Sequence, residues 1–512
     1  MKKRTFLGTM RLIWIAALPT LGVAWGQAAH AQIDEMDPLP LEKVSTDSMM
    51  KHIVELSSEV YEGRLAGTRG HERAVAYVRQ VLTGYGLQNV SEQTFPIECN
   101  EVENAKFNSY IPGSKEKRVF TLGNEFCCAG MTGRGYVDAQ MVFVGYGVSH
   151  HVYDDYKGVD AQGKIVVVLT GTPNWMPGSV GDGFTTLRDK ARTAERHGAI
   201  GMLAINISPS CLPYEPQGKA YSGERPHMGT FPILQVTMDC GRELLTTERE
   251  ALDSVVVTIE RTHKPCSFSL LKHAEIDINA RYRADAPTCN IMGMIPGTDR
   301  TMKNEIVVMG ASLDGTGQQG ETCLFPSADI NASGVAAVLE TARILSTTPY
   351  RPKRSILFVF FSGGEQQWLG SREFLLQYGR LKDVEAFVNV QNIGSGDSLL
   401  VLGDNRYPKM WSVVQSHDTI PSRRYIVHNP EATNPKGDAR AFDMMRIPSV
   451  VITTWNGLRN NHTTTDIWEN INTTILLRAA RLAMETVADL ADGRYQGRTP
   501  QSKGYRYGLI TY

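Results

Sequence analysis

The chain has 512 residues, of which 42% are hydrophobic and 21% are charged. These shares are ordinary for a globular protein and exclude a largely disordered or fibrous chain. Lys and Arg total 53 against 54 Asp and Glu, a net charge of -1, so nothing in the composition favours binding to nucleic acid or to an anionic membrane surface. At the usual ~100–200 residues per domain, the length predicts two to four domains.

The first 31 residues have the pattern of a secretory signal peptide. Basic residues at positions 2–4 precede a mostly apolar run over 12–25, and residues 29–31 (Ala-His-Ala) place small side chains where a signal peptidase reads them. The apolar run is too short to span ~30 Å of hydrocarbon comfortably. The sequence therefore predicts cleavage near Ala31 and export to the periplasm or the medium. No other segment predicts a transmembrane helix, so the mature chain is expected to have none.

The eight cysteines are spaced irregularly and form no paired Cys-x-x-Cys motif, which argues against a structural zinc ribbon. They are Cys99, Cys127, Cys128, Cys211, Cys240, Cys266, Cys289 and Cys323. In an exported chain this set predicts one or more disulfides together with some buried thiols. The spacing leaves the pairing open.

The N-terminal half begins with helices and then changes to short strands. Residues 47–87 have two helical patterns separated by a loop at 62–68. Apolar runs at 141–147 and 164–169 predict buried strands, and 188–197 predicts a helix that leads into the apolar run 198–203. The change in character from about residue 135 to 260 indicates an inserted domain.

After about residue 290 short apolar runs alternate with helical patterns. Strands are predicted at 306–309, 356–361, 387–390, 399–402 and 450–452, and helices at 332–345, 368–378 and 475–490. Such alternation predicts a mixed or parallel sheet covered by helices on both faces. Ligands of such sheets bind at the carboxyl ends of the strands, which directs attention to the residues after each apolar run.

Three of these strand ends have side chains that suit zinc. Asp329, Glu365 and His462 combine two carboxylates with an imidazole, a donor set that zinc accepts. Each residue also has a structural alternative. Asp329 could cap a helix, Glu365 could be a solvated loop charge, and His462 could be an ordinary surface histidine. The residues alone leave these alternatives open.

The segments that contain these residues resemble the signature blocks of the zinc aminopeptidase and glutaminyl cyclase superfamily. The blocks are 329–334 (Asp-Ile-Asn-Ala-Ser-Gly), 365–371 (Glu-Gln-Gln-Trp-Leu-Gly-Ser), and His462 followed by Asp466, in the family's order and spacing. The family includes bacterial leucyl aminopeptidase-like metallopeptidases. Residues 138–168 are similar to the protease-associated domain often inserted in this family. The helix-loop-helix at 47–87, including the loop at 62–68, is similar to the family's N-terminal lead-in.

The resemblance implies an α/β fold with a mixed, mostly parallel sheet sandwiched by helices, and a smaller β-rich protease-associated domain inserted. The expected division is a signal peptide over 1–31, an N-terminal part of the peptidase-like domain over 32–134, the insert over 135–262, the main α/β domain over 263–495, and a tail over 496–512. Family members hold two zinc ions bridged by an aspartate. Position by position, Asp329 matches that bridge, Glu365 the metal glutamate and His462 the late histidine, so one zinc ion per chain is implied.

The remaining family positions depart from the pattern. Ser312 stands where the family has the histidine of a His-x-Asp motif, although the companion Asp314 is present. Gln391 stands where the second site has an aspartate, and the general-base position is Gly364. The second zinc ion of the family thus loses both of the ligands that it does not share with the first ion. Loss of a general base typically lowers a rate by ~10²–10⁴.

Other side chains are weaker candidates for a role in the site. Asp314, Asp397 and Cys323 are the candidates for a replacement base. Asp438, in a segment that looks like the family's substrate-side loop, could recognise a peptide amino terminus or could cap a helix.

Two functions remain open from the sequence. The first is an exported, catalytically impaired peptidase homologue that binds a peptide or protein. Transferrin-receptor-type ectodomains resemble such a protein, because they combine the same two domain types with a role in binding. The alternative is an active exopeptidase of the aminopeptidase type, or a related acyl-transfer enzyme, that uses a single zinc ion. Glutaminyl cyclases also keep the glutamate that is Gly364 here, which counts against cyclase chemistry.

Overall fold

The computed structural model describes residues 39–184, 186–207, 227–246, 251–403, 406–418, 426–427, 435–457 and 460–498. The predicted signal peptide lies outside these residues. In the described part of the chain, no helix is long and apolar enough to cross a membrane.

The helices are α1 (Thr46–Leu56), α2 (Arg69–Gly84), α3 (Gly178–Gly181), α4 (Leu187–Arg196), α5 (Met238–Leu245), α6 (Leu252–Thr262), α7 (Gly334–Thr347), α8 (Leu369–Gln377), α9 (Pro408–Gln415), α10 (Asp438–Met444) and α11 (Thr473–Ala491). Shorter turns are η1 (Leu41–Lys43), η2 (Glu59–Arg64), η3 (Asp182–Phe184), η4 (Ala328–Ser333), η5 (Leu381–Asp383) and η8 (Trp468–Asn470). The strands of the N-terminal half are β1 (Gln88–Tyr110), β2 (Arg118–Phe120), β3 (Phe126–Cys128), β4 (Gly135–Val144), β5 (Ser149–His150), β6 (Tyr153–Asp154), β7 (Ile165–Leu169), β8 (Gly201–Ile205) and β9 (Ile233–Val236). Those that follow are β10 (Ser267–Ile295), β11 (Ile306–Ser312), β12 (Gln318–Gln319), β13 (Cys323–Leu324), β14 (Ser355–Phe361), β15 (Val384–Val390), β16 (Ser398–Leu402), β17 (Ile426–Val427) and β18 (Ser449–Trp455).

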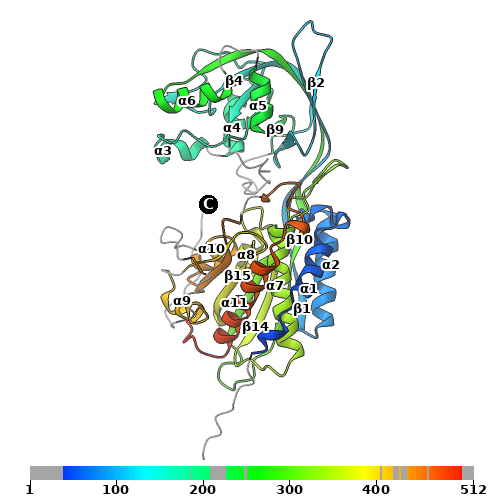
Figure 1. Ribbon diagram of the computed structural model, residues 1–512, viewed down its shortest axis with the longest axis vertical. Helices are drawn as coiled ribbons and strands as arrows, with labels where there is room; N and C mark the ends of the chain where they lie inside the picture. Colours follow the sequence, from blue (N-terminus) through cyan, green and yellow to red (C-terminus); the bar gives the residue numbers. More distant parts are fainter. Residues whose placement is uncertain are drawn as a thin grey trace, which may run out of the picture. The chain divides into compact units, whose positions relative to one another are not determined.

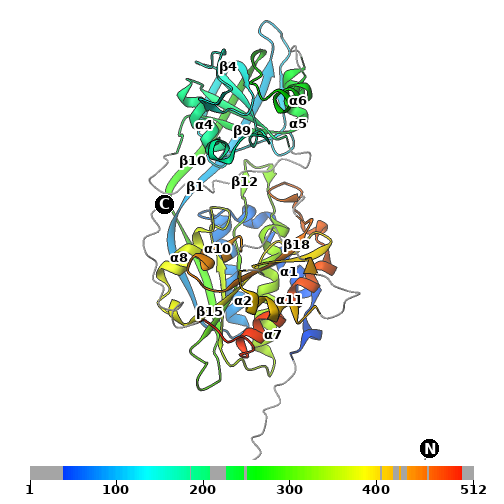
Figure 2. The same ribbon diagram turned by 90° about the vertical axis from the view of Figure 1, so that its left-hand side faces the viewer.

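A long antiparallel ribbon of β1 and β10 links two groups of strands (Figures 1 and 2). The beginning of β10 pairs with β4, and its end pairs with β14. The strand order along the connected sheet is β17-β16-β18-β15-β11-β14-β10-β4-β7-β8-β9-β3. We call the strands from β17 to β14 the main sheet, and those from β4 to β3 the inserted sheet.

The main sheet is mixed and mostly parallel, which confirms the predicted fold class. Strands β14, β11, β15 and β18 run parallel, whereas β16 is antiparallel to β18 and β10 is antiparallel to β14. The edge strand β17 is parallel to β16. Every residue of β11, β14 and β15 is buried, as expected for parallel strands covered on both faces. Because side chains alternate along a strand, Val307 and Met309 pack with one helical layer, and Val308 packs with the other.

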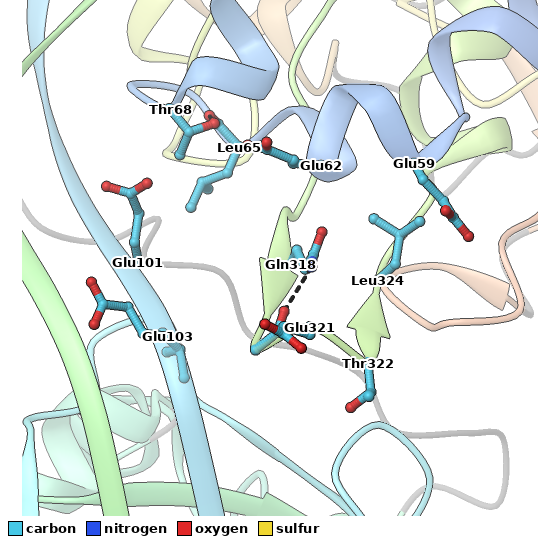
Figure 3. Close-up of a pocket in the computed structure, with 12 residues that line it drawn as sticks. Glu59, Glu62, Leu65, Thr68, Glu101, Glu103, Gln318, Glu321, Thr322 and Leu324 are labelled. Carbon is cyan, nitrogen blue, oxygen red and sulfur yellow. Dashed lines mark hydrogen bonds between the residues drawn. The ribbon is translucent and has the colours of Figure 1, made fainter.

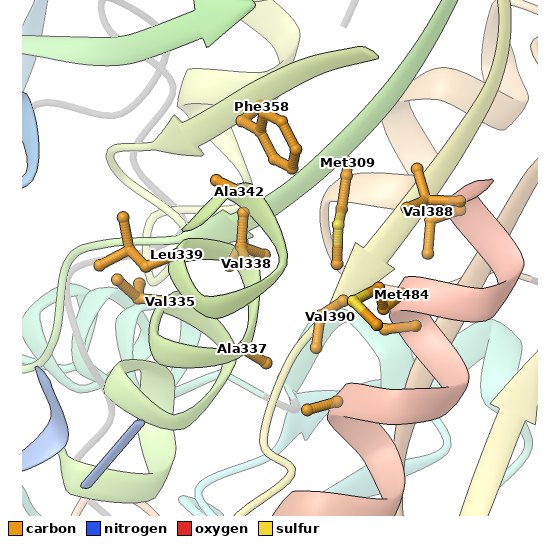
Figure 4. Close-up of a cluster of buried hydrophobic side chains, with 14 of the residues drawn as sticks. Met309, Val335, Ala337, Val338, Leu339, Ala342, Phe358, Val388, Val390 and Met484 are labelled. Atoms are coloured by element: carbon orange, nitrogen blue, oxygen red, sulfur yellow. The ribbon is translucent and has the colours of Figure 1, made fainter. Parts of the chain in front are cut away.

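Helices cover both faces of the main sheet. Helices α1, α2, α7, α9 and α11 share one buried cluster with the sheet, and α8 and α10 share another on the opposite face. In Figure 4, Val338 of α7 and Met484 of α11 lie on the sides of their helices that face Met309 and Val388 of the sheet. The predicted strands and helices after residue 290 are all present, with ends that differ by a few residues.

The inserted sheet has parallel strands β4, β7, β8 and β9, with β3 antiparallel at its edge. Helix α4 and strand β8 occupy the residues predicted as a helix followed by an apolar run. The sequence reading did not predict β1 and β10, which are long and largely polar. The domain limits at 135 and 262 stay a prediction.

The expected disulfide does not form among six of the described cysteines. Cys99, Cys127, Cys128, Cys240, Cys289 and Cys323 are free thiols in this structure. Several of them are separated because they lie in different buried clusters, with Cys99 in one and Cys240 in another. Cys127 and Cys323, by contrast, share a cluster. Cys211 lies outside the described residues.

Candidate functional site

The predicted site residues lie at the carboxyl end of the main sheet, as expected. Ser312 is the last residue of β11, and Glu365 follows β14 by four positions. Gln391 directly follows β15, and His462 follows β18. Parallel strands bring these distant segments to one edge of the sheet.

Glu365 and His462 contact each other directly. The distance from His462 Nε2 to Glu365 Oε2 is 2.8 Å. The other carboxylate oxygen of Glu365 accepts a 3.2 Å hydrogen bond from the Asn331 side chain, which also donates 2.9 Å to the Asp314 carbonyl. Because both partners of Asn331 are acceptors, its amide nitrogen must face Glu365. Burial opposes ionisation of Glu365, but the charge and hydrogen bond of His462 outweigh it and lower the pKa of this carboxyl.

Asp329 is buried and bound to a different loop. Its Oδ1 accepts hydrogen bonds of 2.6 Å from the Gly394 N–H and 3.0 Å from the Ser333 hydroxyl. Its Oδ2 accepts from the Ser395 hydroxyl. Burial raises the pKa of Asp329, and these three donors counteract that rise. The carboxylate therefore ties η4 to the turn after β15.

Asp466, the last residue of the third signature block, helps to hold η4 in place. Its carboxylate accepts hydrogen bonds from the backbone N–H groups of Asp329 at 2.7 Å and Ile330 at 3.1 Å. Burial, together with the nearby Asp329, raises the pKa of Asp466 to about 7.

The predicted ligands do not fit a zinc ion as they stand. A catalytic zinc site needs three protein ligands around one point, and the described residues contain no group of three or more His, Cys, Asp and Glu side chains placed to hold a metal. Glu365 and His462 meet, but Asp329 is engaged elsewhere. The residue of η4 that reaches Glu365 is Asn331, whose amide presents N–H donors. The one-zinc site stays a prediction that requires Asp329 to reorient.

Of the three positions predicted to depart from the family pattern, Ser312 and Gly364 lie against each other. Ser312 donates a 2.7 Å hydrogen bond to Asp438, which is fully buried at the start of α10. Burial raises the pKa of Asp438 to about 6. A Cβ atom at Gly364 would lie 2.3 Å from the Ser312 Oγ, so no side chain fits there without movement. Gln391 is half-buried, and its side chain lies against Gly437.

Asp314 holds the turn that follows β14. Its two oxygens accept hydrogen bonds from the N–H groups of Gly364 at 2.9 Å and Glu365 at 3.2 Å. Burial, and then the neighbouring Glu365, raise the pKa of Asp314 to about 8. Asp314 and Asp438 thus lie beside the centre of the site and bind protein groups.

Comparison with known proteins agrees with this arrangement. Residues 290–487 match peptidase family M28, and residues 137–244 match the PA domain. The chain therefore has an M28-like region over 290–487, preceded by a PA-like region over 137–244.

Its relatives include receptors as well as enzymes. The chain is 24% identical over 418 residues to human transferrin receptor protein 2, covering 70% of this chain and 48% of the receptor. It is 24% identical over 405 residues to aminopeptidase YwaD of Bacillus subtilis, covering 77% and 72% of the two chains. The structure of a zinc aminopeptidase from B. subtilis has the same fold, with a TM-score of 0.62, 20% identity, and coverage of 89% and 96%. The chain thus spans about half the length of the receptor that it matches.

Arg64 holds the loop between β11 and η4 in place, a role that was not predicted from the sequence. It is fully buried, and its guanidinium donates to the carbonyls of Leu313 at 3.1 Å, Pro326 at 3.0 Å and Ser327 at 2.7 Å, and also to Leu56. Burial lowers the pKa of Arg64 to about 10. These bonds join the lead-in to both ends of the loop between β11 and η4. The lead-in motif at 62–68 was the only signal in the sequence that pointed to it.

The described residues also line an acidic cavity of about 550 Å³ (Figure 3). Its walls come from the lead-in, from β1 and from the β12–β13 hairpin: Glu59, Glu62, Leu65, Thr68, Glu101, Val102, Glu103, Gln318, Gly320, Glu321, Thr322 and Leu324. Three of the glutamates are partnered, Glu62 by Arg73, Glu101 by Arg281 and Arg283, and Glu103 by Asn279.

The predicted replacement bases lie in settings that do not favour that role. Asp314 is held by two backbone N–H groups. Cys323 is fully buried in an apolar cluster, and burial raises its pKa to about 12. Asp397 accepts a 3.1 Å hydrogen bond from the Asn456 side chain. None of the contacts named here for these three residues is with His462.

Proposed function

We propose that the mature chain is an exported M28-domain protein whose peptide hydrolysis is absent or strongly impaired, and which binds a peptide or protein. The observation that carries this proposal is the hydrogen bonding of Glu365. Its carboxylate is occupied by His462 and Asn331, and the preceding position is a glycine. A glycine has no side chain to accept a proton from water, so general-base catalysis from this position is lost.

The donor groups around the centre support the same conclusion. For zinc to bind Asp329 together with Glu365 and His462, the carboxylate of Asp329 would have to turn and give up some of its hydrogen bonds from Gly394, Ser333 and Ser395. Buried polar groups that lose their partners cost about 1–3 kcal/mol each. The alternative function, a single-zinc exopeptidase, requires this rearrangement and also a new base.

The relatives are compatible with a binding role on this fold. One of them is named as a transferrin receptor and another as an aminopeptidase. A fold hosts several functions, and the function depends on the site. In this chain the supporting carboxylates Asp314 and Asp466 are kept, while Gly364 and Ser312 have replaced the family's base and ligand. A domain with these replacements keeps the surface of the fold and lacks the family's base and one of its metal ligands.

The first test measures hydrolysis and metal content together. The mature protein is purified without chelator and assayed on a panel of aminoacyl p-nitroanilides with and without added zinc, beside Glu365→Ala and Asp329→Ala variants. We expect background hydrolysis and less than one zinc per chain. Substantial turnover that Glu365→Ala abolishes would overturn the impaired hydrolysis. One zinc per chain that Asp329→Ala removes would overturn the argument against a zinc site and leave the hydrolysis result to decide the function.

The second test measures binding. Fluorescent peptides from an array are titrated against the mature protein, with and without chelator. Saturable binding that survives the chelator and leaves the peptide uncleaved is the expected result.

N-terminal sequencing of the exported chain tests the predicted cleavage, and a first residue of Gln32 is expected.

A further inference from the structure

Two buried thiols lie where the β12–β13 hairpin contacts β3. The side chain of Gln319 in β12 accepts a 2.8 Å hydrogen bond from the backbone N–H of Cys128 and donates one of 2.8 Å to its carbonyl. Cys323 is the partner of Gln319 across the hairpin. Since directly opposed residues of an antiparallel pair have Cβ atoms ~4.5–5.5 Å apart, Cys323 lies beside β3.

The direction of the side chains along β3 selects one of its two cysteines. Successive side chains of a strand point to opposite faces. Phe126 and Cys128 point into the core of the inserted sheet. Cys127 points the other way, into a small cluster that contains Cys323, Phe325 and Leu122. Cys127 and Cys323 are both fully buried.

We propose that Cys127 and Cys323 form a disulfide when the chain folds in an oxidising compartment. The oxidant is a small-molecule disulfide such as glutathione disulfide. The thiolate of one cysteine attacks this disulfide and releases one glutathione thiol. The thiolate of the second cysteine then displaces the other glutathione, so two thiols lose two protons and two electrons, and the oxidant becomes two thiols. This inference rests on the export in the proposed function and not on the impaired hydrolysis or the binding role, and refolding with glutathione tests the pairing apart from export.

The timing of this reaction follows from burial. The thiolate is the attacking species in thiol–disulfide exchange. Burial raises the pKa of Cys323 to about 12 and raises that of Cys127 well above its ordinary value. The two thiols therefore exchange while the hairpin is still docking, and the finished bond is protected from reductant.

The bond would fix one wall of the acidic cavity. Gln318, Gly320, Glu321, Thr322 and Leu324, all on or next to the hairpin, line that cavity. A hairpin of two-residue strands has few backbone hydrogen bonds of its own. A covalent link to β3 would hold its position.

The experiment maps disulfides in the full mature chain. The protein is refolded in a reduced and oxidised glutathione mixture, its free thiols are alkylated in denaturant, and tryptic peptides are analysed by mass spectrometry with and without reduction. We expect a peptide with Cys127 and Cys128 linked to the peptide that contains Cys323, with fragmentation that places the bond on Cys127. The matched variants are Cys127→Ser, in which the link is lost, and Cys128→Ser, in which it is kept.

The map of the unmodified chain decides the matter even if a variant does not fold. Full alkylation of Cys127 and Cys323 before reduction would overturn the proposal. So would a bond from Cys323 to Cys128, or a link that persists in Cys127→Ser.

Discussion

The side chains that support the candidate site and the side chains at its centre differ in what they bind. The support consists of Arg64, Asp314, Asp329 and Asp466, all buried. Their hydrogen bonds go mostly to backbone groups of the loops at the strand ends. Such bonds fix the paths of the loops and do not depend on a metal or substrate.

The centre is the part predicted to depart from the family pattern. By the resemblance, Ser312, Gly364 and Gln391 stand at the positions of a histidine and two carboxylates, and Asn331 donates to Glu365 where a cation would need an acceptor. The proposed function is thus an intact support around a centre without its full donor set. This contrast agrees with the proposed binding role, in which the loops are held in place for their shape. It also predicts that damage to the support costs folding stability and that damage to the centre costs little.

The largest expected effect is loss of the buried guanidinium. Arg64→Met leaves the carbonyls of Leu313, Pro326 and Ser327 without these donors, and each buried acceptor left without a partner costs about 1–3 kcal/mol. Urea unfolding followed by circular dichroism measures the change. The control is Arg73→Met, which removes an exposed pair with Glu62 worth about 1 kcal/mol or less. Equal effects of the two variants would contradict the contrast.

Acid should lower the folding stability through two buried histidines, one in α1 and one in α2. Burial lowers the pKa of His52 to about 4 and that of His71 to about 3, below the ordinary value near 6.5. Each contributes stability that is present above pH ~6.5 and is lost as the pH falls toward the folded pKa, because the unfolded chain binds the proton first. For His52 the loss amounts to about 3 kcal/mol.

The variant His52→Gln isolates this contribution. His52 contacts the hydroxyls of Tyr77 at 2.7 Å and Tyr85 at 3.1 Å. We expect the difference in unfolding free energy between pH 7 and pH 4.5 to be smaller in His52→Gln than in the unmodified chain. Tyr85→Phe removes a hydrogen bond without removing the histidine, and its pH dependence should stay close to that of the unmodified chain. An unchanged slope in His52→Gln would contradict the prediction.

Much of the fold was predictable because its signals are local. Buried parallel strands such as β14 and β15 read as short apolar runs between helical patterns. The ribbon of β1 and β10 was not predicted because much of it is polar and exposed, with charged residues along its length. Its continuous apolar run is confined to the end of β10, at residues 291–295. Its stability comes from pairing between residues such as Phe107 and Ile276, which lie far apart in the sequence.

The site was predictable in position and not in contacts. The rule that parallel strands end at one edge placed Glu365 and His462 together, and the structure has them 2.8 Å apart. The orientation of Asp329 depends on Gly394 and Ser395, which lie in another loop about sixty residues later. The partners of Arg64 are more distant still. No local pattern reports such contacts.

A smaller effect is expected at the tightest contact of the centre. Gly364→Ala places a Cβ atom 2.3 Å from the Ser312 Oγ, and overpacking of this kind costs about 1–3 kcal/mol. Ser312→Gly removes the clash, so the double variant should recover part of the loss, which unfolding curves of all three variants can measure. Gly84→Ala is the matched control. It lies in α2 with nothing within 4 Å, and alanine there should stabilise by about 0.5–1 kcal/mol.

The smallest effect is expected at the residue that the family uses for metal. Glu365→Gln removes a carboxylate that is 13% exposed and paired with His462, and it keeps an oxygen that can accept from Asn331. Partly exposed ion pairs contribute about 1 kcal/mol or less, so the melting temperature should fall by no more than a few degrees. Aminoacyl hydrolysis should stay at background in both proteins. If instead the variant lost a measurable activity while its stability was unchanged, Glu365 would be acting on a substrate or a metal, and the centre would have to be regarded as chemically competent.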